Sequence, residues 1–185
     1  MDSIINIIKK RISVRAYTDQ LLSDSTINSI LEAARYAPSA RNLQQLEYKV
    51  ITNKTAMRNI SSTINAVIQK EMAAMPAGAS ATPQLPIRDD YYYNAPLLII
   101  ITGPRENSWI ETDAGIAAQN MMLYATSINL GSCFIGMTRF IQKDSQMLRE
   151  LHITEDRKIV GAVICGYPKE QPSVKEKYLK VEFLK

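Results

Sequence analysis

Two arginines and a serine alternate in a short stretch near the start of the chain. Arg11, Ser13 and Arg15 are separated by single residues. In an extended backbone alternate side chains point to one face, so these three groups would face the same way. Guanidinium and hydroxyl groups together suit a phosphate, and an arginine can also face a developing negative charge. Two solvated arginines beside a strand-like turn would give the same pattern.

Two further segments carry groups that could hold a ligand. Residues 37–44 read Ala-Pro-Ser-Ala-Arg-Asn-Leu-Gln, and their short polar side chains and turn amides could hydrogen-bond a heterocycle. A loop that merely ends a helix has a similar composition. Farther along, Gly131 and Gly136 would let the backbone approach another group closely. Cys133 lies between them, but no histidine lies near it in sequence, so a structural use of this stretch is favoured over a catalytic thiol.

The sequence lacks the motifs of most catalysis by side chains alone. His152 is the single histidine, and Cys133 and Cys165 are too far apart for a paired-cysteine motif. The chain has no glycine-rich dinucleotide fingerprint, no P-loop and no nucleophile elbow. We therefore expect no metal site and no catalytic side chain. If the protein is an enzyme, a bound cofactor would carry the chemistry.

The composition indicates one globular domain over residues 1–185. Hydrophobic residues make up 46% and charged residues 22% of the chain, enough for a substantial core. The net charge of +4 comes without a long basic run, so no nucleic-acid partner is expected. The longest apolar run, residues 97–101, is too short to cross a bilayer, and the chain does not open like a signal peptide. We expect a cytoplasmic protein without a membrane partner.

The spacing of apolar residues predicts the main elements. Helical spacing predicts helices over residues 4–10, 25–36, 55–75, 112–130 and 144–152. Strands are predicted over residues 48–52, 97–102 and 159–165. The last two are continuous apolar runs, and the lack of alternation in 97–102 predicts burial on both faces. The prolines and small residues of 76–90 predict a mobile surface loop.

Local signals predict where two of these helices begin and end. Ser23 or Ser25 would cap the helix over residues 25–36. Thr112 or Asp113 would cap the longest apolar helix, and a glycine at position 131 would end it. That helix is apolar nearly all round, which predicts a central, buried position.

The end of the chain has a strand pattern. Leu179, Val181 and Phe183 alternate with Lys180 and Glu182. With no hairpin partner nearby in sequence, such a strand can add to a sheet edge of its own subunit or of a second one.

In this order and spacing the segments resemble the nitroreductase family of FMN enzymes. The family shows, in turn, Arg-x-Ser-x-Arg, a helix, an Ala-Pro-Ser-x-x-Asn-x-Gln loop, an Ala-Pro strand, a long Asp-x-Gly-x-Ala-x-Gln-Asn helix, a Gly-x-x-x-x-Gly turn and a strand that ends in Gly-Tyr-Pro. The matching residues are Arg11, Ser13, Arg15, Ala37, Pro38, Ser39, Asn42, Gln44, Ala95, Asp113, Gly115, Ala117, Gln119, Asn120, Gly131, Gly136, Gly166, Tyr167 and Pro168. The resemblance covers about residues 5–178.

The resemblance implies one FMN per subunit in the interface of a homodimer. The implied cofactor contacts are Arg11, Ile12, Ser13, Arg15, Pro38, Ser39, Asn42, Gln44, Cys133, Ile135, Gly136, Lys175 and Lys177. Residues 11 and 13 and the two lysines would hold the phosphate and ribityl chain, and Arg15 would lie near the flavin N1 and O2. Residues 38, 39 and 42 would reach the cofactor from the other subunit. The turn over residues 133–136 would lie over the ring, with the Gly136 amide directed at O4 or N5.

The resemblance also implies the fold and the reaction. The fold would be α+β, with a central, mostly antiparallel sheet flanked by helices, in a homodimer that exchanges C-terminal strands. NADH or NADPH would reduce FMN and leave, and a small electron acceptor such as a nitroaromatic or a quinone would then be reduced in a ping-pong mechanism. A flavin-modifying enzyme of the same fold and a flavin-binding or storage protein are the alternatives.

Overall fold

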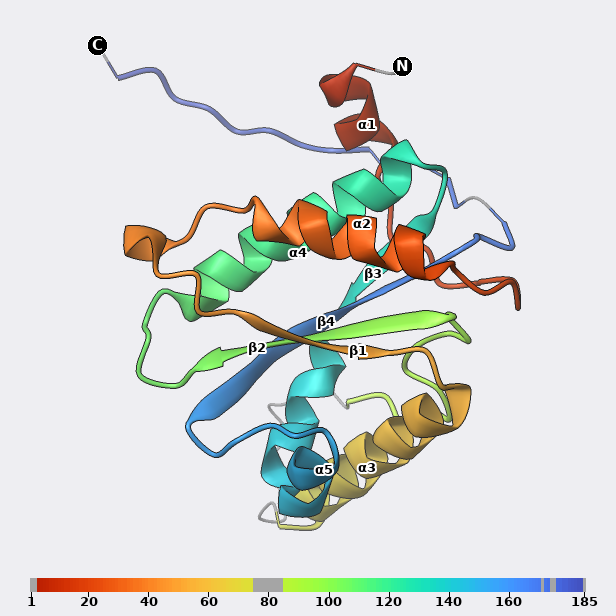
Figure 1. The fold of residues 1–185 in the computed structure, drawn as a ribbon, viewed down its shortest axis with the longest axis vertical. Helices are drawn as coiled ribbons and strands as arrows, with labels where there is room; N and C mark the ends of the chain where they lie inside the picture. Colours follow the sequence, from red (N-terminus) through yellow and green to blue (C-terminus); the bar gives the residue numbers. More distant parts are fainter. Residues whose placement is uncertain (1–2, 75–84, 171, 174–175, 185) are drawn as a thin grey trace.

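A computed structural model describes residues 3–74, 85–170, 172–173 and 176–184. Its centre is a four-stranded sheet with helices on both faces (Figure 1). The strands pair antiparallel in the order β1-β2-β4-β3. They are β1 (Glu47–Ile51), β2 (Leu97–Pro104), β3 (Gly131–Ile135) and β4 (Arg157–Gly166). The α+β class expected from the sequence is confirmed.

The middle of the sheet is formed by β2 and β4. Every residue of β2 is buried, as the unbroken apolar run predicted. Ile99 and Ile100 belong to the two different cores, one on each face of the sheet, and both are fully inaccessible. On its outer side β1 pairs with no other strand in the part of the chain that the structure describes.

The sequence interpretation of residues 131–136 as a glycine turn is wrong for most of its length. Gly131–Ile135 form β3, which pairs with β4 in continuous register. A Cβ on Gly131 would lie 2.8 Å from side-chain atoms of Val14. This glycine therefore serves close packing against a neighbouring segment instead of a turn.

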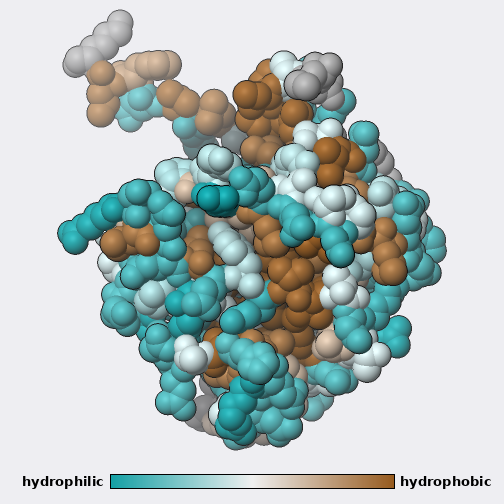
Figure 2. Space-filling model, viewed as in Figure 1, coloured by the Kyte–Doolittle hydropathy of each residue, from teal (hydrophilic) through white to brown (hydrophobic). Residues whose placement is uncertain are grey.

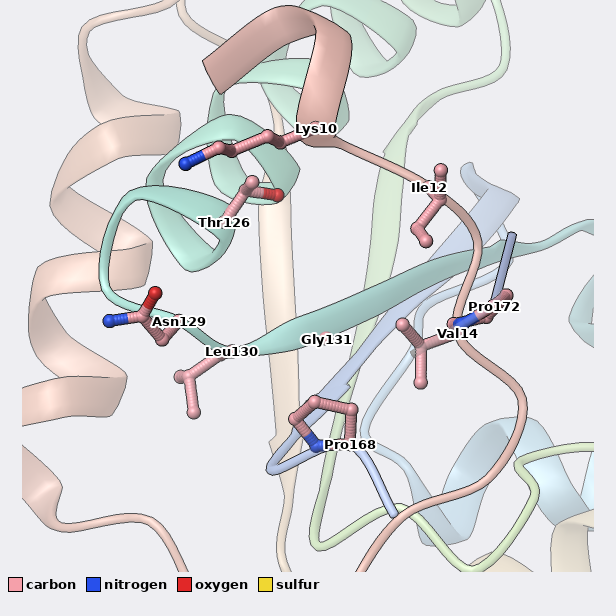
Figure 3. A pocket seen from close by; sticks show the side chains of 9 residues that line it. All are labelled: Lys10, Ile12, Val14, Thr126, Asn129, Leu130, Gly131, Pro168 and Pro172. Atoms are coloured by element: carbon pink, nitrogen blue, oxygen red, sulfur yellow. The ribbon is translucent and has the colours of Figure 1, made fainter. Parts of the chain in front are cut away.

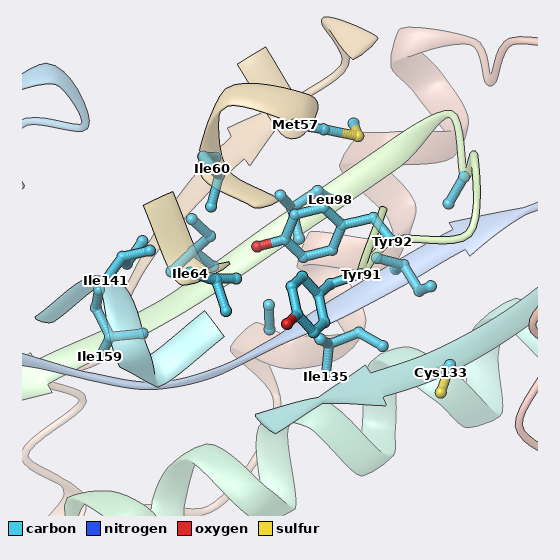
Figure 4. Close-up of a cluster of buried hydrophobic side chains, with 14 of the residues drawn as sticks. Met57, Ile60, Ile64, Tyr91, Tyr92, Leu98, Cys133, Ile135, Ile141 and Ile159 are labelled. Carbon is cyan, nitrogen blue, oxygen red and sulfur yellow. The ribbon is translucent and has the colours of Figure 1, made fainter. Parts of the chain in front are cut away.

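Two layers of helices enclose the sheet (Figure 1). The helices are α1 (Ile4–Lys10), α2 (Asp24–Arg35), α3 (Lys54–Ala73), α4 (Ile110–Ser127) and α5 (Ser145–Glu150), with short 3-10 turns η1 (Ala40–Asn42) and η2 (Gly136–Lys143). One face is covered by α2 and α4, and the other by α3, η2 and α5. Met57, Ile60 and Ile64 of α3, at helical spacing, supply much of the second core (Figure 4).

One helix start follows the sequence signal and the other does not. The Ser23 hydroxyl accepts the Thr26 N–H at 3.2 Å and so caps α2, which selects one of the two expected caps. In contrast, α4 begins at Ile110, and no side chain caps it. Thr112 and Asp113 already lie inside the helix, so the expected cap there is wrong.

The end of α4 also differs from the expectation. The helix ends at Ser127, well before Gly131. Asn129 then takes a left-handed φ of 62°, and the Leu130 N–H donates to the Ala125 carbonyl at 2.8 Å. An asparagine tolerates this conformation better than most residues, so it can end a helix in place of glycine.

The chain ends in an exposed, extended tail. Residues 176–184 pair with no strand in the part of the chain that the structure describes, and they run past α1, away from the sheet (Figure 1). Leu179 and Phe183 are each 86% exposed. The expectation that these residues form a strand with a second subunit stays a prediction. Most of the loop expected over residues 76–90 lies outside the described residues.

Candidate functional site

The N-terminal segment (residues 11–17) runs along the outer edge of β3. Ser13 forms a parallel bridge with Ser132, and the Val14 N–H donates to the Ser132 carbonyl at 3.0 Å. Tyr17 forms an antiparallel bridge with Pro168, just after β4. Val14 and Tyr17 are each only 4% exposed. The backbone is therefore extended, as expected, and buried side chains fix the face that it turns to the core.

Three odd-numbered polar groups of this segment affect the pKa of one thiol of β3. Cys133 is 1% exposed, and this burial raises its pKa. The charge of Arg15, a hydrogen bond from Ser13 and the charge of Arg11 all act in the opposite direction. The bridge between Ser13 and Ser132 places this segment directly beside β3. Because its pKa is raised, the thiol is protonated at neutral pH, which does not suit a nucleophile.

Gly136, directly after β3, has open space beside its backbone. Ile135 is 6% exposed, and Gly136 is half-buried at the start of η2. A Cβ on Gly136 would have no atom within 4 Å, so space lies beside this backbone. Of the turn expected over residues 133–136, only this last residue leaves the strand. The segment that holds Arg11, Ser13 and Arg15 thus lies beside the strand that holds Cys133 and Ile135, and Gly136 follows that strand.

The loop of residues 38–44 lies at the other end of the α2/α4 layer (Figure 1). Arg41, Asn42 and Gln44 have positive φ values of 54°, 55° and 52°. The Ser39 hydroxyl accepts the Gln44 backbone N–H at 3.1 Å, and the Gln44 side chain donates to the side-chain oxygen of Asn42 at 2.8 Å. Within one chain this loop does not meet the arginines of the N-terminal segment.

Two residues that sequence analysis did not assign to the site hold this loop. The buried Asp113 carboxylate accepts the Ala40 N–H at 3.0 Å. The Arg157 guanidinium donates to the Gln45 carbonyl at 2.8 Å. Asp113 belongs to a recognised motif but was interpreted as a helix cap. A single arginine before a strand gives no signal in the sequence.

A cavity of about 210 Å³ lies on the opposite side of the N-terminal segment (Figure 3). The even-numbered residues Lys10, Ile12 and Val14 line it, together with the end of α4 and the start of β3. Since alternate residues of an extended chain face opposite ways, the cavity is separated from Arg11, Ser13 and Arg15. The side chain of Ile12 lines this cavity, and its expected contact with the cofactor stays a prediction.

The basic pair expected in the tail is only partly described. Lys177 is exposed in the extended tail. Lys175 lies outside the described residues. Among the described residues, no three or more His, Cys, Asp or Glu side chains gather as a metal site would require. No helix in the described ranges is both long and apolar enough to span a membrane.

Known proteins share this architecture over its whole length. A nitroreductase with bound FMN from Bacteroides fragilis is 27% identical, with a TM-score of 0.82 over 100% of both chains. A second nitroreductase with bound FMN, from Desulfitobacterium hafniense, is 25% identical, with a TM-score of 0.79 over 98% of this chain and 100% of the other. The FMN reductase [NAD(P)H] of Bacillus subtilis is 22% identical over 95% of this chain and 70% of its own length. The sequence also matches the Nitroreductase family over residues 8–167, and the chain therefore belongs to the nitroreductase family.

Proposed function

We propose that the protein binds FMN beside β3 and uses it to pass electrons from NADH or NADPH to small acceptors such as nitroaromatics or quinones. The chain is an FMN-dependent NAD(P)H oxidoreductase. The observation that carries this proposal is the pairing with β3 of the segment that holds Arg11, Ser13 and Arg15, in a strand that leads to the open space at Gly136. The relatives crystallised with FMN, and the relative named for FMN and NAD(P)H, support the choice of cofactor and donor.

The groups of this segment and of Gly136 fit a flavin nucleotide. A phosphate carries about two negative charges, and charge-assisted bonds from guanidinium groups are the strongest that a side chain offers it. Arg11 and Ser13 would bind the phosphate and ribityl chain. Arg15 would lie against the N1–O2 edge of the ring. At Gly136 the missing side chain leaves room for a flat ring against the backbone.

FMN, when bound, supplies a ring that accepts a hydride and passes electrons on to a second substrate. Arg15 would hold a fixed positive charge where negative charge develops, which lowers the energy of the reduced state. The Gly136 amide would donate to the ring edge. No side chain of the chain needs to act as an acid or base, since solvent can supply protons. One site that serves donor and acceptor in succession gives ping-pong kinetics.

We propose that the site is completed by a second copy of the chain. The 38–44 loop is remote from β3 in its own subunit, so Pro38, Ser39, Asn42 and Gln44 would contact the FMN of the partner. Each subunit also exposes apolar side chains that a partner would cover. Ile4, Ile5 and Ile8 of α1 are 76%, 53% and 43% exposed.

The surface supports an exchange of tails. Figure 2 shows apolar side chains gathered over α1 and the tail, with a further apolar band between α2 and β1. Val50 of β1 is 40% exposed, and the outer edge of this strand has no partner strand in the described residues. A tail strand from the partner would cover such an edge. Burying each large apolar side chain contributes about 1.5–3 kcal/mol.

An anaerobic titration tests the proposal. The protein is purified with added FMN, and its visible spectrum is followed as NADH or NADPH is added. We expect a flavin absorbance that one of the nucleotides bleaches and that a nitroaromatic or quinone then restores. Chromatography of the flavin after turnover would show intact FMN, whereas a flavin-modifying protein would consume it, and a storage protein would not be bleached. A colourless protein after incubation with FMN would exclude the proposal.

A further inference from the structure

We infer that Asp113 is a positioning residue that holds the 38–44 loop in the shape that meets the flavin of the partner subunit. The inference rests on the proposed function. The 38–44 loop would form the part of the site that the second subunit supplies. The buried carboxylate of Asp113 would hold this loop in shape without itself contacting FMN.

The loop has a backbone shape that its sequence does not favour. All three of Arg41, Asn42 and Gln44 adopt the left-handed region, which asparagine tolerates and which arginine and glutamine do not favour. A side chain in this region brings its Cβ close to the following carbonyl, so each such residue raises the free energy of the loop. Three of them within four positions persist only if the surroundings favour the conformation.

Asp113 provides a fixed point at the start of the loop. Its side chain is only 3% exposed, and its Oδ1 accepts the Ala40 N–H at 3.0 Å. Ala40 directly precedes the first left-handed residue. The carboxylate sits near the N-terminus of α4, where the helix dipole stabilises a negative charge. A charge-assisted bond from a fixed helix to this amide holds the entry of the loop.

Arg157 provides a second fixed point at the exit. Its guanidinium donates to the Gln45 carbonyl at 2.8 Å and pairs with Glu47 at 3.1 Å. The Asn107 side chain donates to the Gln45 side-chain oxygen at 2.9 Å. The loop thus spans two clamps, one on α4 and one on β4. Of these two clamps, the bond from Ala40 to Asp113 is the one next to Ser39. The Ser39 hydroxyl in turn accepts the Gln44 N–H across the loop.

Loss of the Asp113 bond would leave the Ala40 amide without its partner and release the entry of the loop. The loop would then populate its competent shape for only a fraction of the time. Apparent affinity for a ligand falls in proportion to that fraction. The effect would therefore appear in FMN binding, beyond any loss of overall stability.

The test compares two carboxylates that each accept one backbone N–H. Asp113→Ala removes the bond to Ala40, and Asp113→Asn keeps an oxygen acceptor of the same shape. Asp144→Ala is the matched control, because Asp144 accepts the Met147 N–H at 2.7 Å as the cap of α5, on the other face of the sheet. For each protein we would measure the FMN dissociation constant, the visible circular dichroism of bound FMN and the unfolding midpoint without FMN.

We expect Asp113→Ala to weaken FMN binding at least tenfold and to alter the visible circular dichroism, with Asp113→Asn recovering most of both. Asp144→Ala should lower the unfolding midpoint while leaving the dissociation constant within about twofold. Equal dissociation constants for Asp113→Ala and the wild type, at equal dimer content, would overturn the inference. A wild-type protein that binds no FMN would instead overturn the proposed function.

A second variant protects the test against a protein that fails to fold. Ala40→Pro removes the donor and leaves Asp113 in place, and Ser39 before it already has the extended φ and ψ of −133° and 154° that a following proline requires. The same loss of FMN affinity is expected. Combined with Asp113→Ala, it should add little further loss, because both changes break the same bond. Fully additive losses would contradict the assignment.

Discussion

The N-terminal segment and the 38–44 loop both carry proposed FMN contacts, yet they are held in different ways. Backbone hydrogen bonds to β3 and buried side chains at Val14 and Tyr17 fix the N-terminal segment. The loop is left-handed at several residues, and side chains from distant elements hold it. A paired strand keeps its shape when its outward side chains change, whereas the shape of a strained loop depends on single remote residues.

Deletion of residues 176–185 should have the largest effect. If the two halves of the site come from different chains, loss of the tail removes both the dimer and most FMN binding, at least 100-fold. Light scattering and FMN titration measure the two effects. Lys180→Gln with Glu182→Gln, on the polar face of the same tail, is the control and should leave both unchanged. A truncated protein that is still dimeric with unchanged affinity would refute the tail exchange.

Removal of an arginine from the N-terminal segment should weaken FMN binding without unfolding the protein. Arg11→Ala and Arg15→Ala each remove a charge-assisted bond of about 1.5–3 kcal/mol, which corresponds to roughly 10–100-fold in the dissociation constant. The urea midpoint should not move, because the backbone holds this segment. Arg35→Ala, at an arginine whose side chain is 75% exposed, is the control and should bind FMN normally. A large fall in stability for Arg11→Ala would show that the segment depends on side chains as the loop does.

Gly131 at the start of β3 and Gly136 just after its end should respond differently to substitution by alanine. The first change should affect packing, and the second should affect FMN binding. Gly131→Ala would push a Cβ to 2.8 Å from Val14 and should cost about 1–3 kcal/mol of unfolding free energy. Gly136→Ala meets nothing within 4 Å in this chain, so its stability should stay within about 0.5 kcal/mol while FMN binding weakens. Urea unfolding and FMN titration of both variants measure the difference. The reverse outcome would mean that the space at Gly136 is not part of the site.

The last prediction concerns the pH dependence of the free energy of unfolding, which a buried thiol of β4 should affect. Burial raises the pKa of Cys165, which is fully buried opposite Ser132, from 9.0 to about 12. The folded state therefore keeps this proton longer than the unfolded state does. Its contribution to stability is complete below pH 9 and declines between pH 9 and 12, by up to about 1.4 kcal/mol per pH unit.

Cys165→Ala should remove that part of the decline. Urea unfolding of both proteins at pH 8 and pH 10 measures it, since the constant loss of packing cancels when the two values are compared. Identical pH dependence in the two proteins would contradict the raised pKa.

Sequence patterns alone were sufficient for the α+β class, the main helices, the two central strands and the family. Their signals are local. The apolar run of residues 97–102 by itself predicts a buried strand, and Ser23 by itself predicts a helix start. The alternation of Arg11, Ser13 and Arg15 likewise predicted an extended backbone, and the bridge from Ser13 to β3 agrees with it.

Only the tertiary structure decided the roles of residues whose partners are distant in the chain. Asp113 carries the signature of a helix cap, but packing of α4 against the loop turns its carboxylate to Ala40, 73 positions earlier. Gly131 carries the signature of a turn, but the approach of Val14 makes it part of a strand. In both cases the free energy comes from burial and hydrogen bonds between elements that the fold brings together, and no local pattern encodes those contacts.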